Sequence, residues 1–523
     1  MAPPNDTGYH GDMPRKLALH EDRLFPPDPT VRGIARDLFR SIRDLPIVSP
    51  HGHTDPAWFA DNAPFGNATE LLLAPDHYLF RSVRDLPIVS PHGHTDPAWF
   101  AGNEPFSNAT ELLLAPDHYL FRMLYSQGVS LDAVGVDSRR GRSTADPREA
   151  WRLFASRFHL FNGTPSWLWL NHVFTEVFGI DVMLEAATAD RYFDAIGAAL
   201  QTPALRPRAL FERFNIEVLA TTESPVDPLE HHRRIRESGW PGRVITTYRP
   251  DPVVDPEHEQ FRAALERFGQ LTGKDVHHWS GYLQAHRARR AEFIRAGATA
   301  TDHGHPTART ADLSESQCER LFARVLTGTF TYDEAELFRA QMLLEMARMS
   351  LDDGLVMQIH PGSFRNHNRR LFEEYGRDKG ADIPMPTDYV KGLQPLLDRF
   401  GNEPNLSVIL FTLDETAYSR ELAPLAGHYP ILKLGPAWWF HDSPEGIRRF
   451  REQTTETAGF YNTVGFNDDT RAFLSIPARH DVARRVDCAY LARLVAEHRL
   501  DETDAADIAA ELAYKLPKRA SKL

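Results

Sequence analysis

The stretch LPIVSPHGH at residues 86–94 joins a short strand pattern to a pair of histidines. Its apolar, β-branched run from Leu86 to Val89 is typical of a buried strand, and His92-Gly93-His94 follows after a Ser-Pro turn. Residues i and i+2 of an extended backbone project to the same side, so both imidazoles can reach one ion. The stretch therefore predicts a strand with a candidate metal site at its carboxyl end.

Seven more runs of this kind follow along the chain, and most are separated by longer stretches with helical periodicity. The alternation of strands and helices predicts an α/β fold with a parallel sheet, and eight strands predict a closed, TIM-like (β/α)8 barrel. The aromatic-rich stretch before the second strand predicts an inserted helical subdomain over roughly 123–213. The eight expected strands are Leu86 to Val89 (or Leu45 to Val48 in an earlier copy), Ile216 to Ala220, Val244 to Thr247, Ala298 to Thr301, Leu355 to Ile359, Leu406 to Phe411, Ile431 to Leu434 and Thr463 to Phe466.

The segment that contains the first strand is duplicated. Residues 41–81 recur almost unchanged as residues 82–122. Repeat folds generally need three or more units, so two near-identical copies predict a tandem duplication in which one copy is surplus. We expect an N-terminal arm and helix over 1–40, the surplus copy over 41–81 and the barrel over 82–523. The copies differ only at Ile42/Val83, Asp61/Gly102, Ala63/Glu104 and Gly66/Ser107.

Composition excludes several classes of protein. Lys and Arg number 59 against 72 Asp and Glu, a net charge of −13, which does not suit a partner such as DNA or RNA. The longest apolar runs, such as Leu406 to Leu413, are far shorter than the ~20 residues of a membrane span, and the first residues lack the apolar run of a signal peptide. Only two cysteines, Cys318 and Cys488, occur, so no disulfide framework is expected. These features predict a cytoplasmic protein.

Polar side chains follow most of the expected strands, where the active sites of such barrels lie. An isolated His-x-His is a weak signal by itself, but its place after a strand strengthens it. Asp469 follows the eighth strand, which neighbours the first in a closed barrel, so it is the best-placed third ligand. His360, after the fifth strand, could be a ligand or an acid/base that contacts the substrate.

Three arginines also stand just past strands. Arg249, Arg365 and Arg471 are all expected at the mouth of the barrel. A guanidinium binds a carboxylate with two parallel hydrogen bonds, so three of them together predict an anionic substrate. No Gly-rich loop follows a strand and opens a helix, so no nucleotide cofactor is expected.

Motifs along nearly the whole chain extend this pattern. Together with the HGH segment they resemble the uronate isomerases (glucuronate isomerase) of the amidohydrolase superfamily. The motifs are HEDRLF (20–25), APDHYLFRML (115–124), NGTPSWLWLNH (162–172), LATTESPVDPLEHH (219–232), TTYRPDP (246–252), ATDHG (300–304), HPGSFRNHN (360–368), GPAWWFHD (435–442) and DDTRAFLSIPARH (468–480).

The resemblance implies a bacterial enzyme with a metal-centred (β/α)8 barrel of the metal-dependent hydrolase type. It implies interconversion of D-glucuronate with D-fructuronate and of D-galacturonate with D-tagaturonate, so the partners are small hexuronates. The implied ligands of a divalent metal, with zinc favoured, are His92, His94 and Asp469; the family is uneven in how strictly it needs the metal. The implied catalytic residues are Tyr119, Asp302, His360 and Asp469, and the implied substrate contacts are His118, Arg249, Arg365, Arg471 and Trp438 or Trp439.

Aldose–ketose conversion moves a proton from C2 to C1 and needs a base, a polarising group and a clamp on the sugar. We expect Tyr119 to shuttle that proton and Asp469 to assist ring opening or hydroxyl proton transfer. The main alternative is a metal-dependent hydrolase on the same barrel, and a noncatalytic sugar-acid binding protein is a third. Binuclear hydrolases of this superfamily add a bridging Lys or Glu after strand four and a His after strand six, whereas this chain has Asp302 and Leu413-Asp414-Glu415 there.

The duplication leaves two sets of candidate residues. We expect the second copy to supply the working strand because it runs without interruption into Met123 and the residues that follow. The first copy would instead offer His51 and His53 as ligands and Tyr78 in place of Tyr119, and a hybrid of the two copies is also sterically conceivable. Whether the chain forms a homo-oligomer is left open by the sequence.

Overall fold

A computed structural model describes residues 25, 28–41 and 86–523 of the chain. In these ranges the main sheet is parallel and seven-stranded, and its strand order β1-β2-β3-β4-β5-β8-β9 follows the order along the chain. All carboxyl ends therefore meet at one edge of the sheet. The strands are β1 (Ile88–Ser90), β2 (Ile216–Glu223), β3 (Arg243–Tyr248), β4 (Ala300–His303), β5 (Val356–Ile359), β8 (Val408–Leu410) and β9 (Leu432–Leu434), and a separate antiparallel pair is formed by β6 (Ser363–Phe364) and β7 (Ile383–Pro384).

The predicted parallel α/β sheet is confirmed, but the eighth expected strand, over 463–466, is not a strand in the structure. Thr463 forms only an isolated parallel bridge with Leu434 of β9. The backbone leaves the extended conformation at Gly465, where φ is +78°, and again at Asp469, where φ is +40°. Positive φ interrupts a hydrogen-bonded ladder, so the described sheet has seven strands where a closed eight-stranded barrel was expected.

The strands are largely buried on both faces, as is usual in a parallel sheet. All residues of β4 and β5 are buried. One side of the first strands forms a small inner cluster of Val89, Val218, Ala220 and Ile245. A larger core lies between the sheet and the helices around it, which fixes where each strand ends and thus where the polar residues after it lie.

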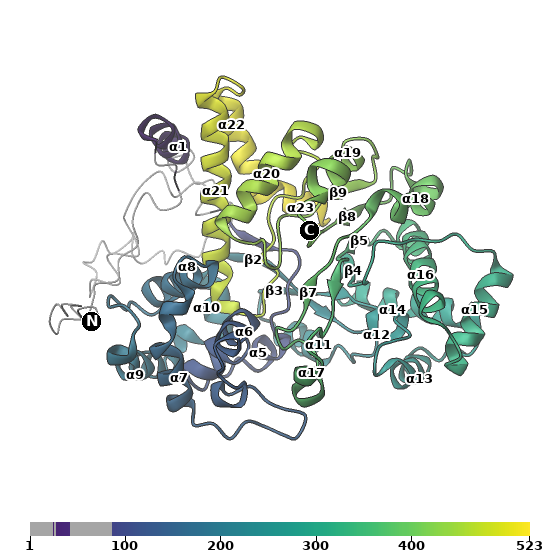
Figure 1. Cartoon of the computed structure of the whole chain (residues 1–523), viewed down its shortest axis with the longest axis horizontal. Coiled ribbons are helices and arrows are strands. Elements are labelled where there is room, and N and C mark those ends of the chain that lie inside the picture. Colours follow the sequence, from purple (N-terminus) through teal and green to yellow (C-terminus); the bar gives the residue numbers. More distant parts are fainter. Residues whose placement is uncertain (1–24, 26–27, 42–85) are drawn as a thin grey trace, which may run out of the picture.

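Helices after β2 surround the sheet. Figure 1 shows α16 and α18 beside β5 and β8, and the long α21 crossing the molecule near β2. The helices are α11 (Glu230–Glu237), α12 (Asp251–Val254), α13 (Phe261–Thr272), α14 (Trp279–Arg295), α15 (Glu315–Thr327), α16 (Tyr332–Asp353), α17 (Arg369–Tyr375), α18 (Tyr389–Phe400), α19 (Ala423–Ala426), α20 (Pro444–Ala458), α21 (Ile476–Ala496), α22 (Glu502–Ala510) and α23 (Leu516–Ala520).

A second group of helices lies between β1 and β2 and gathers at one side of the molecule (Figure 1). Its aromatic core includes Trp151, Phe154, Phe158 and Phe174, whose bulk explains why this stretch packs as a unit. The helices fill the range expected for the insertion and begin before it. They are α5 (Pro97–Gly102), α6 (His118–Ser126), α7 (Pro147–Ser156), α8 (Pro165–His172), α9 (Ala189–Leu200) and α10 (Pro207–Arg213).

Helix α1 (Pro29–Ser41) packs near the C-terminal helices, where Ala35 joins an apolar cluster with Cys488 and Leu491 of α21. The expected surplus copy, with His51, His53 and Tyr78, lies outside the described residues. Cys318 and Cys488 are free and buried. Of the helices in the described ranges, none has the length and apolar character needed to cross a membrane.

Candidate active site

A cavity of about 950 Å³ opens at the carboxyl ends of the strands. Its volume lies in the range of small-molecule sites. Among the sequence-predicted residues within 86–523, only Asp302 does not line it; that carboxylate is fully buried behind His360. The predicted residues that line the cavity are His92, His94, His118, Tyr119, Arg249, His360, Arg365, Trp438, Trp439, Asp469 and Arg471.

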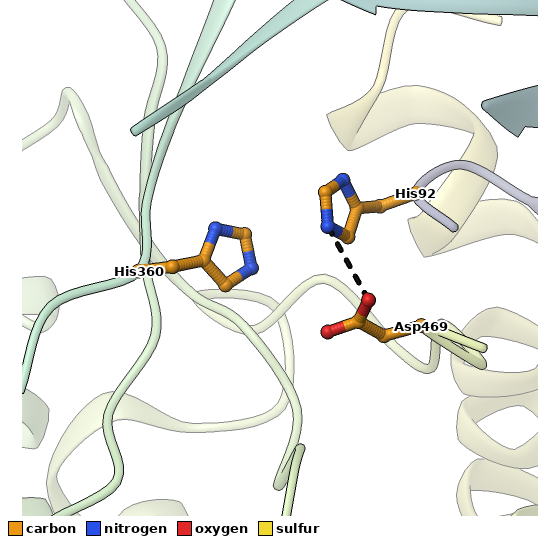
Figure 2. A group of neighbouring side chains, drawn as sticks. All are labelled: His92, His360 and Asp469. Carbon is orange, nitrogen blue, oxygen red and sulfur yellow. Dashed lines mark ion pairs between the residues drawn. The ribbon is translucent and has the colours of Figure 1, made fainter. Parts of the chain in front are cut away.

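Four of these residues form a compact cluster of imidazoles and a carboxylate. His92 and His94 follow β1, His360 follows β5, and Asp469 lies beyond β9. Asp469 Oδ1 lies 3.5 Å from His92 Nε2 and 3.2 Å from His94 Nε2. The rings of His92 and His360 stack with their centroids 4.8 Å apart, and Figure 2 shows His92, His360 and Asp469 converging on one space.

The donor set of this cluster fits a divalent metal ion. Ligand atoms of His92, His360 and Asp469 all lie within 4.8 Å of one another. His360 Nε2 is buried and has no hydrogen-bond partner in the part of the chain that the structure describes, which is costly unless a ligand satisfies it. Two imidazoles and a carboxylate are ligands that zinc commonly takes. The compact triad thus contains His360. The predicted ligand His94 contacts the same Asp469 oxygen, but its side chain is more exposed than that of His92.

The protonation states in the cluster suit metal binding. Burial lowers the pKa of His94 and of His360, which keeps both rings neutral. Burial alone would raise the pKa of Asp469, but the surrounding histidines, His92 above all, outweigh it and hold the pKa below its usual range. Neutral imidazoles and an ionised carboxylate are the forms that bind metals.

Asp302 holds His360 in place. Its Oδ1 lies 2.8 Å from His360 Nδ1, so the other ring nitrogen, Nε2, is left for the cavity. The other oxygen of Asp302, Oδ2, lies 2.9 Å from Arg249 Nη1. Trp438 packs against the His360 ring at 4.5 Å and donates from Nε1 to Thr412 O, whereas its neighbour Trp439 lies against Arg365.

Tyr119 lies in the first turn of α6 because Asp117 caps that helix and accepts from Tyr119 N at 2.8 Å. The phenol donates to Asp442 Oδ1 at 2.8 Å and accepts from Phe440 N at 2.8 Å. Burial, with Asp442 adding to it, raises the pKa of Tyr119 well above its ordinary value. Next to it, burial and the charge of Arg471 lower the pKa of His118 to about 3. Both groups are therefore neutral near pH 7.

Each of the three predicted arginines is paired with an aspartate. Arg249 Nε lies 2.9 Å from Asp251 Oδ2 in addition to its contact with Asp302. On the neighbouring loop, Arg365 Nη1 lies 2.9 Å from Asp382 Oδ2 and its guanidinium lies over the Trp439 ring at 5.2 Å.

Arg471 pairs with Asp378 at 3.1 Å. Burial raises the pKa of Asp378, but Arg471, Arg365 and Arg249 outweigh it and hold the pKa far below its usual range. One protein carboxylate thus lies within the field of all three guanidinium groups. The arrangement can hold an anion at this side of the cavity only by sharing or displacing resident aspartates.

Sequence reasoning missed the residues that pair with the predicted ones. Asp442 stands beside the predicted Trp438 and Trp439, so its place after a strand could have marked it. Arg479 lies inside α21 and belongs to the motif DDTRAFLSIPARH (468–480), which could have marked it, but its place on a helix after the strands gave no reason to single it out. Asp251 begins the short helix α12, and Asp378 and Asp382 lie in a loop whose path the sequence pattern does not reveal.

Comparisons with known proteins agree with the site. The family model for glucuronate isomerase matches residues 30–85 and again residues 79–520, one match for each copy of the duplicated segment. The uronate isomerase of Phenylobacterium zucineum is 68% identical over 511 residues, 98% of each chain, and that of Xanthomonas campestris is 65% identical over 98% of this chain and all of that protein. The crystal structure of glucuronate isomerase from Caulobacter crescentus superposes with a TM-score of 0.89 at 64% identity, over 97% of this chain and 98% of that one.

These findings confirm the resemblance seen in the motifs and do not favour the hydrolase alternative. The chain belongs to the glucuronate isomerase (uronate isomerase) family.

Proposed function

We propose that the chain interconverts the aldose and ketose forms of hexuronates, D-glucuronate with D-fructuronate and D-galacturonate with D-tagaturonate. The observation that carries this proposal is one cavity that joins a buried imidazole–carboxylate cluster, a tyrosine and three arginines. Relatives named uronate isomerase at 65% to 68% identity support it.

The arginine side of the cavity binds the substrate carboxylate. Arg365 is the best placed, because its guanidinium is fixed by Asp382 and by the Trp439 ring yet still lines the cavity. A planar guanidinium can hold one protein carboxylate and still offer N–H groups to a second one. Arg471 and Arg249 add positive charge on the same side.

Proton transfer is the role of Tyr119 and Asp469. Tyr119 lines the cavity and moves the proton between C2 and C1. Asp469 assists the proton exchange between the hydroxyl and carbonyl oxygens, because it is ionised and lies among three imidazoles. The sugar would thus lie with its carboxylate toward the arginines and its C1–C2 end toward Tyr119.

His92, His360 and Asp469, with His94 beside them, would hold a divalent metal, and zinc suits this donor set best. When bound, such an ion acts as a Lewis acid toward substrate oxygens. Asp302 supports the site by orienting His360, and its contact with Arg249 ties the cluster to the arginine side.

The second copy of the duplicated segment supplies the working residues. Its strand β1 pairs with β2 from Ile88 to Ser90, and His92 and His94 follow directly. The segment over 463–470 would complete a barrel-like ring, since Val464 N donates to Leu434 O after β9 and His94 N donates to Thr470 O after β1. Both contacts support a closed arrangement in which Asp469 meets the histidines.

The test is turnover. The purified chain is incubated with D-glucuronate and, separately, D-galacturonate, and ketose formation is followed by proton nuclear magnetic resonance. We expect conversion of at least one substrate without a nucleotide cofactor. A folded, metal-supplemented sample that converts neither would contradict the proposal, and release of a hydrolysis product from a model ester or amide would favour the hydrolase instead.

A further inference from the structure

We propose that Asp442 is a positioning residue for Tyr119 and forms one proton relay with it: the carboxylate takes the phenol's own proton while the phenol oxygen receives the proton from C2. This inference rests on the proposed function. It concerns a residue outside the cavity lining that acts only through Tyr119.

The contacts of the phenol leave one position open. A tyrosine hydroxyl has one proton and two lone pairs. The proton points to Asp442 Oδ1 at 2.8 Å, and one lone pair accepts Phe440 N at 2.8 Å. The second lone pair is the single remaining acceptor, and Tyr119 borders the cavity. Among the described residues, the phenol thus has one acceptor position without a partner, on a side chain that borders the cavity.

Chemistry requires a partner for this phenol. A neutral hydroxyl that takes up a proton without losing its own would become a strongly acidic oxonium, so it cannot act as a base alone. Tyr119 is neutral, since burial and Asp442 raise its pKa. A carboxylate in hydrogen-bond reach removes this obstacle.

The relay balances in protons and electrons. The C2–H bond breaks, its proton bonds to the Tyr119 oxygen, and the original phenol proton passes to Asp442 Oδ1. The electron pair of the C2–H bond becomes the C1–C2 double bond while the aldehyde π electrons move onto O1. In the second half Asp442 returns its proton to the phenol oxygen, and Tyr119 delivers one to C1, where the C1–C2 π electrons form the new C1–H bond. The proton on O2 passes to O1 by way of Asp469 as the C2 carbonyl forms. The net change is the isomerisation itself.

Arg479 holds the Asp442 carboxylate in place. Its Nη1 donates to Asp442 Oδ2 at 2.6 Å, and both side chains are buried. The guanidinium also lies 3.6 Å over the Trp169 ring and donates to Asp468 O at 3.3 Å, which fixes its direction. A pair that served stability alone would need only the Oδ2 contact. The Oδ1 contact with the phenol is the additional feature that the relay explains.

The matched control is Asp487, which lies on α21, the helix that also contains Arg479. Asp487 of α21 forms a buried pair with Arg451, at 2.7 Å and 2.9 Å, and has no contact with the cavity. Asp442→Asn and Asp487→Asn therefore both remove the charge of a buried aspartate that pairs with an arginine, and each pair has one partner in α21. Steady-state kinetics on whichever uronate the wild type converts, the effect of deuterium at C2 and the melting temperature are measured for both variants and for Asp442→Glu.

We expect Asp442→Asn to lose about 100-fold in kcat, the scale of a general acid–base contribution, with KM within about threefold. The isotope effect of C2 deuterium on kcat should rise, because proton transfer becomes slower than the other steps. Asp442→Glu should recover part of kcat, and Asp487→Asn should keep kcat within about threefold. A structural role would lower the melting temperature in both Asn variants without changing the isotope effect.

The relay is wrong if folded Asp442→Asn keeps kcat within about threefold or loses activity through KM alone. Should Asp442→Asn not fold, Asp442→Glu is compared with Tyr119→Phe and with the double variant. If the activity losses of the two single variants do not add up in the double variant, Tyr119 and Asp442 act as one unit. Additive losses would overturn the relay. Wild-type protein that converts neither uronate contradicts the proposed function itself, which is a separate outcome.

Discussion

The two sides of the cavity differ in whether the protein itself satisfies their polar groups. On the arginine side, Arg249, Arg365 and Arg471 each have an aspartate oxygen within 3.1 Å. On the histidine side, formed by His92, His94, His360 and Asp469, His360 Nε2 and His92 Nδ1 are buried and have no hydrogen-bond partner among the described residues. Aspartates of the protein thus neutralise the three arginines, whereas the two histidine nitrogens are left without a partner in the described part of the chain.

This difference indicates how strongly each side would bind its ligand. Unsatisfied buried nitrogens gain the full value of a new partner, so the histidine side favours a tightly held ion. Paired arginines gain less, because a substrate carboxylate must share them with Asp302, Asp382 and Asp378. Changes on the histidine side should therefore cost more activity than changes on the arginine side.

The largest effect is expected from His92→Ala with His94→Ala. Loss of two imidazoles should reduce bound metal, measured by elemental analysis, and lower isomerisation by at least about 1000-fold, because metal ligation and charge stabilisation are lost together. The matched control is His51→Ala with His53→Ala in the first copy. If that control abolishes both properties while the first pair leaves them intact, the second copy is not the working one.

A smaller effect is expected from Arg365→Lys. An ammonium cannot reproduce the planar fork, so kcat/KM should fall by about 10- to 100-fold, or about 1.4 to 2.7 kcal/mol, while the melting temperature changes little. Arg369→Lys is the control, because Arg369 is 88% exposed and, among the described residues, forms an ion pair with Glu373 alone. Near-normal kinetics in Arg365→Lys would place Arg365 among ordinary ion pairs.

Asp378→Asn should act in the opposite direction. Removal of this carboxylate frees Arg471 from its partner at 3.1 Å, so the substrate meets less competition and KM should fall about two- to fivefold. Glu373→Gln, which breaks the exposed pair with Arg369, should leave KM unchanged. A higher KM in Asp378→Asn would show that the aspartate orders the arginines for the substrate and does not compete with it.

The smallest effect concerns stability and pH. Glu223 lies beside the arginine side, since its carbonyl accepts Arg249 N at 3.0 Å, and its side chain lies 3.7 Å from His232 Nε2. Burial lowers the pKa of His232 to about 4, so this imidazole is neutral near pH 7. Burial raises the pKa of Glu223 from 4.5 to about 8. A raised folded pKa means that the stabilisation is complete below about pH 4.5 and is lost as the pH rises through 8.

Glu223→Gln should remove this dependence. Urea unfolding at pH 6 and pH 9 should show a larger fall in the midpoint for the wild type than for the variant. Equal falls in the two proteins would mean that Glu223 is already ionised at pH 6, and the contrast between a neutral carboxyl and the ionised aspartates nearby would disappear.

The sequence predicted the strands well where burial leaves a clear pattern. Seven expected strands occur, because apolar runs such as 355–359 lie inside the sheet on both faces. The eighth failed because Gly465 and Asp469 adopt positive φ, which the apolar content of 463–466 does not reveal. The family followed from motifs spread along the chain, since those motifs contain the residues that line the cavity.

By itself, the sequence determined the positions of the strands, the residues that follow them and the family. Each of these depends on local pattern: burial imposes period and composition on a strand, and polar groups after it belong to the edge of the sheet. Tertiary structure alone decided which polar groups meet. Tyr119, Asp442 and Arg479 come from α6, the loop after β9 and α21, and only the packing of these elements brings them within hydrogen-bond distance. In the same way, His360 joins His92 and Asp469 because β5 and β1 lie in one curved sheet, a relation that no spacing along the chain contains.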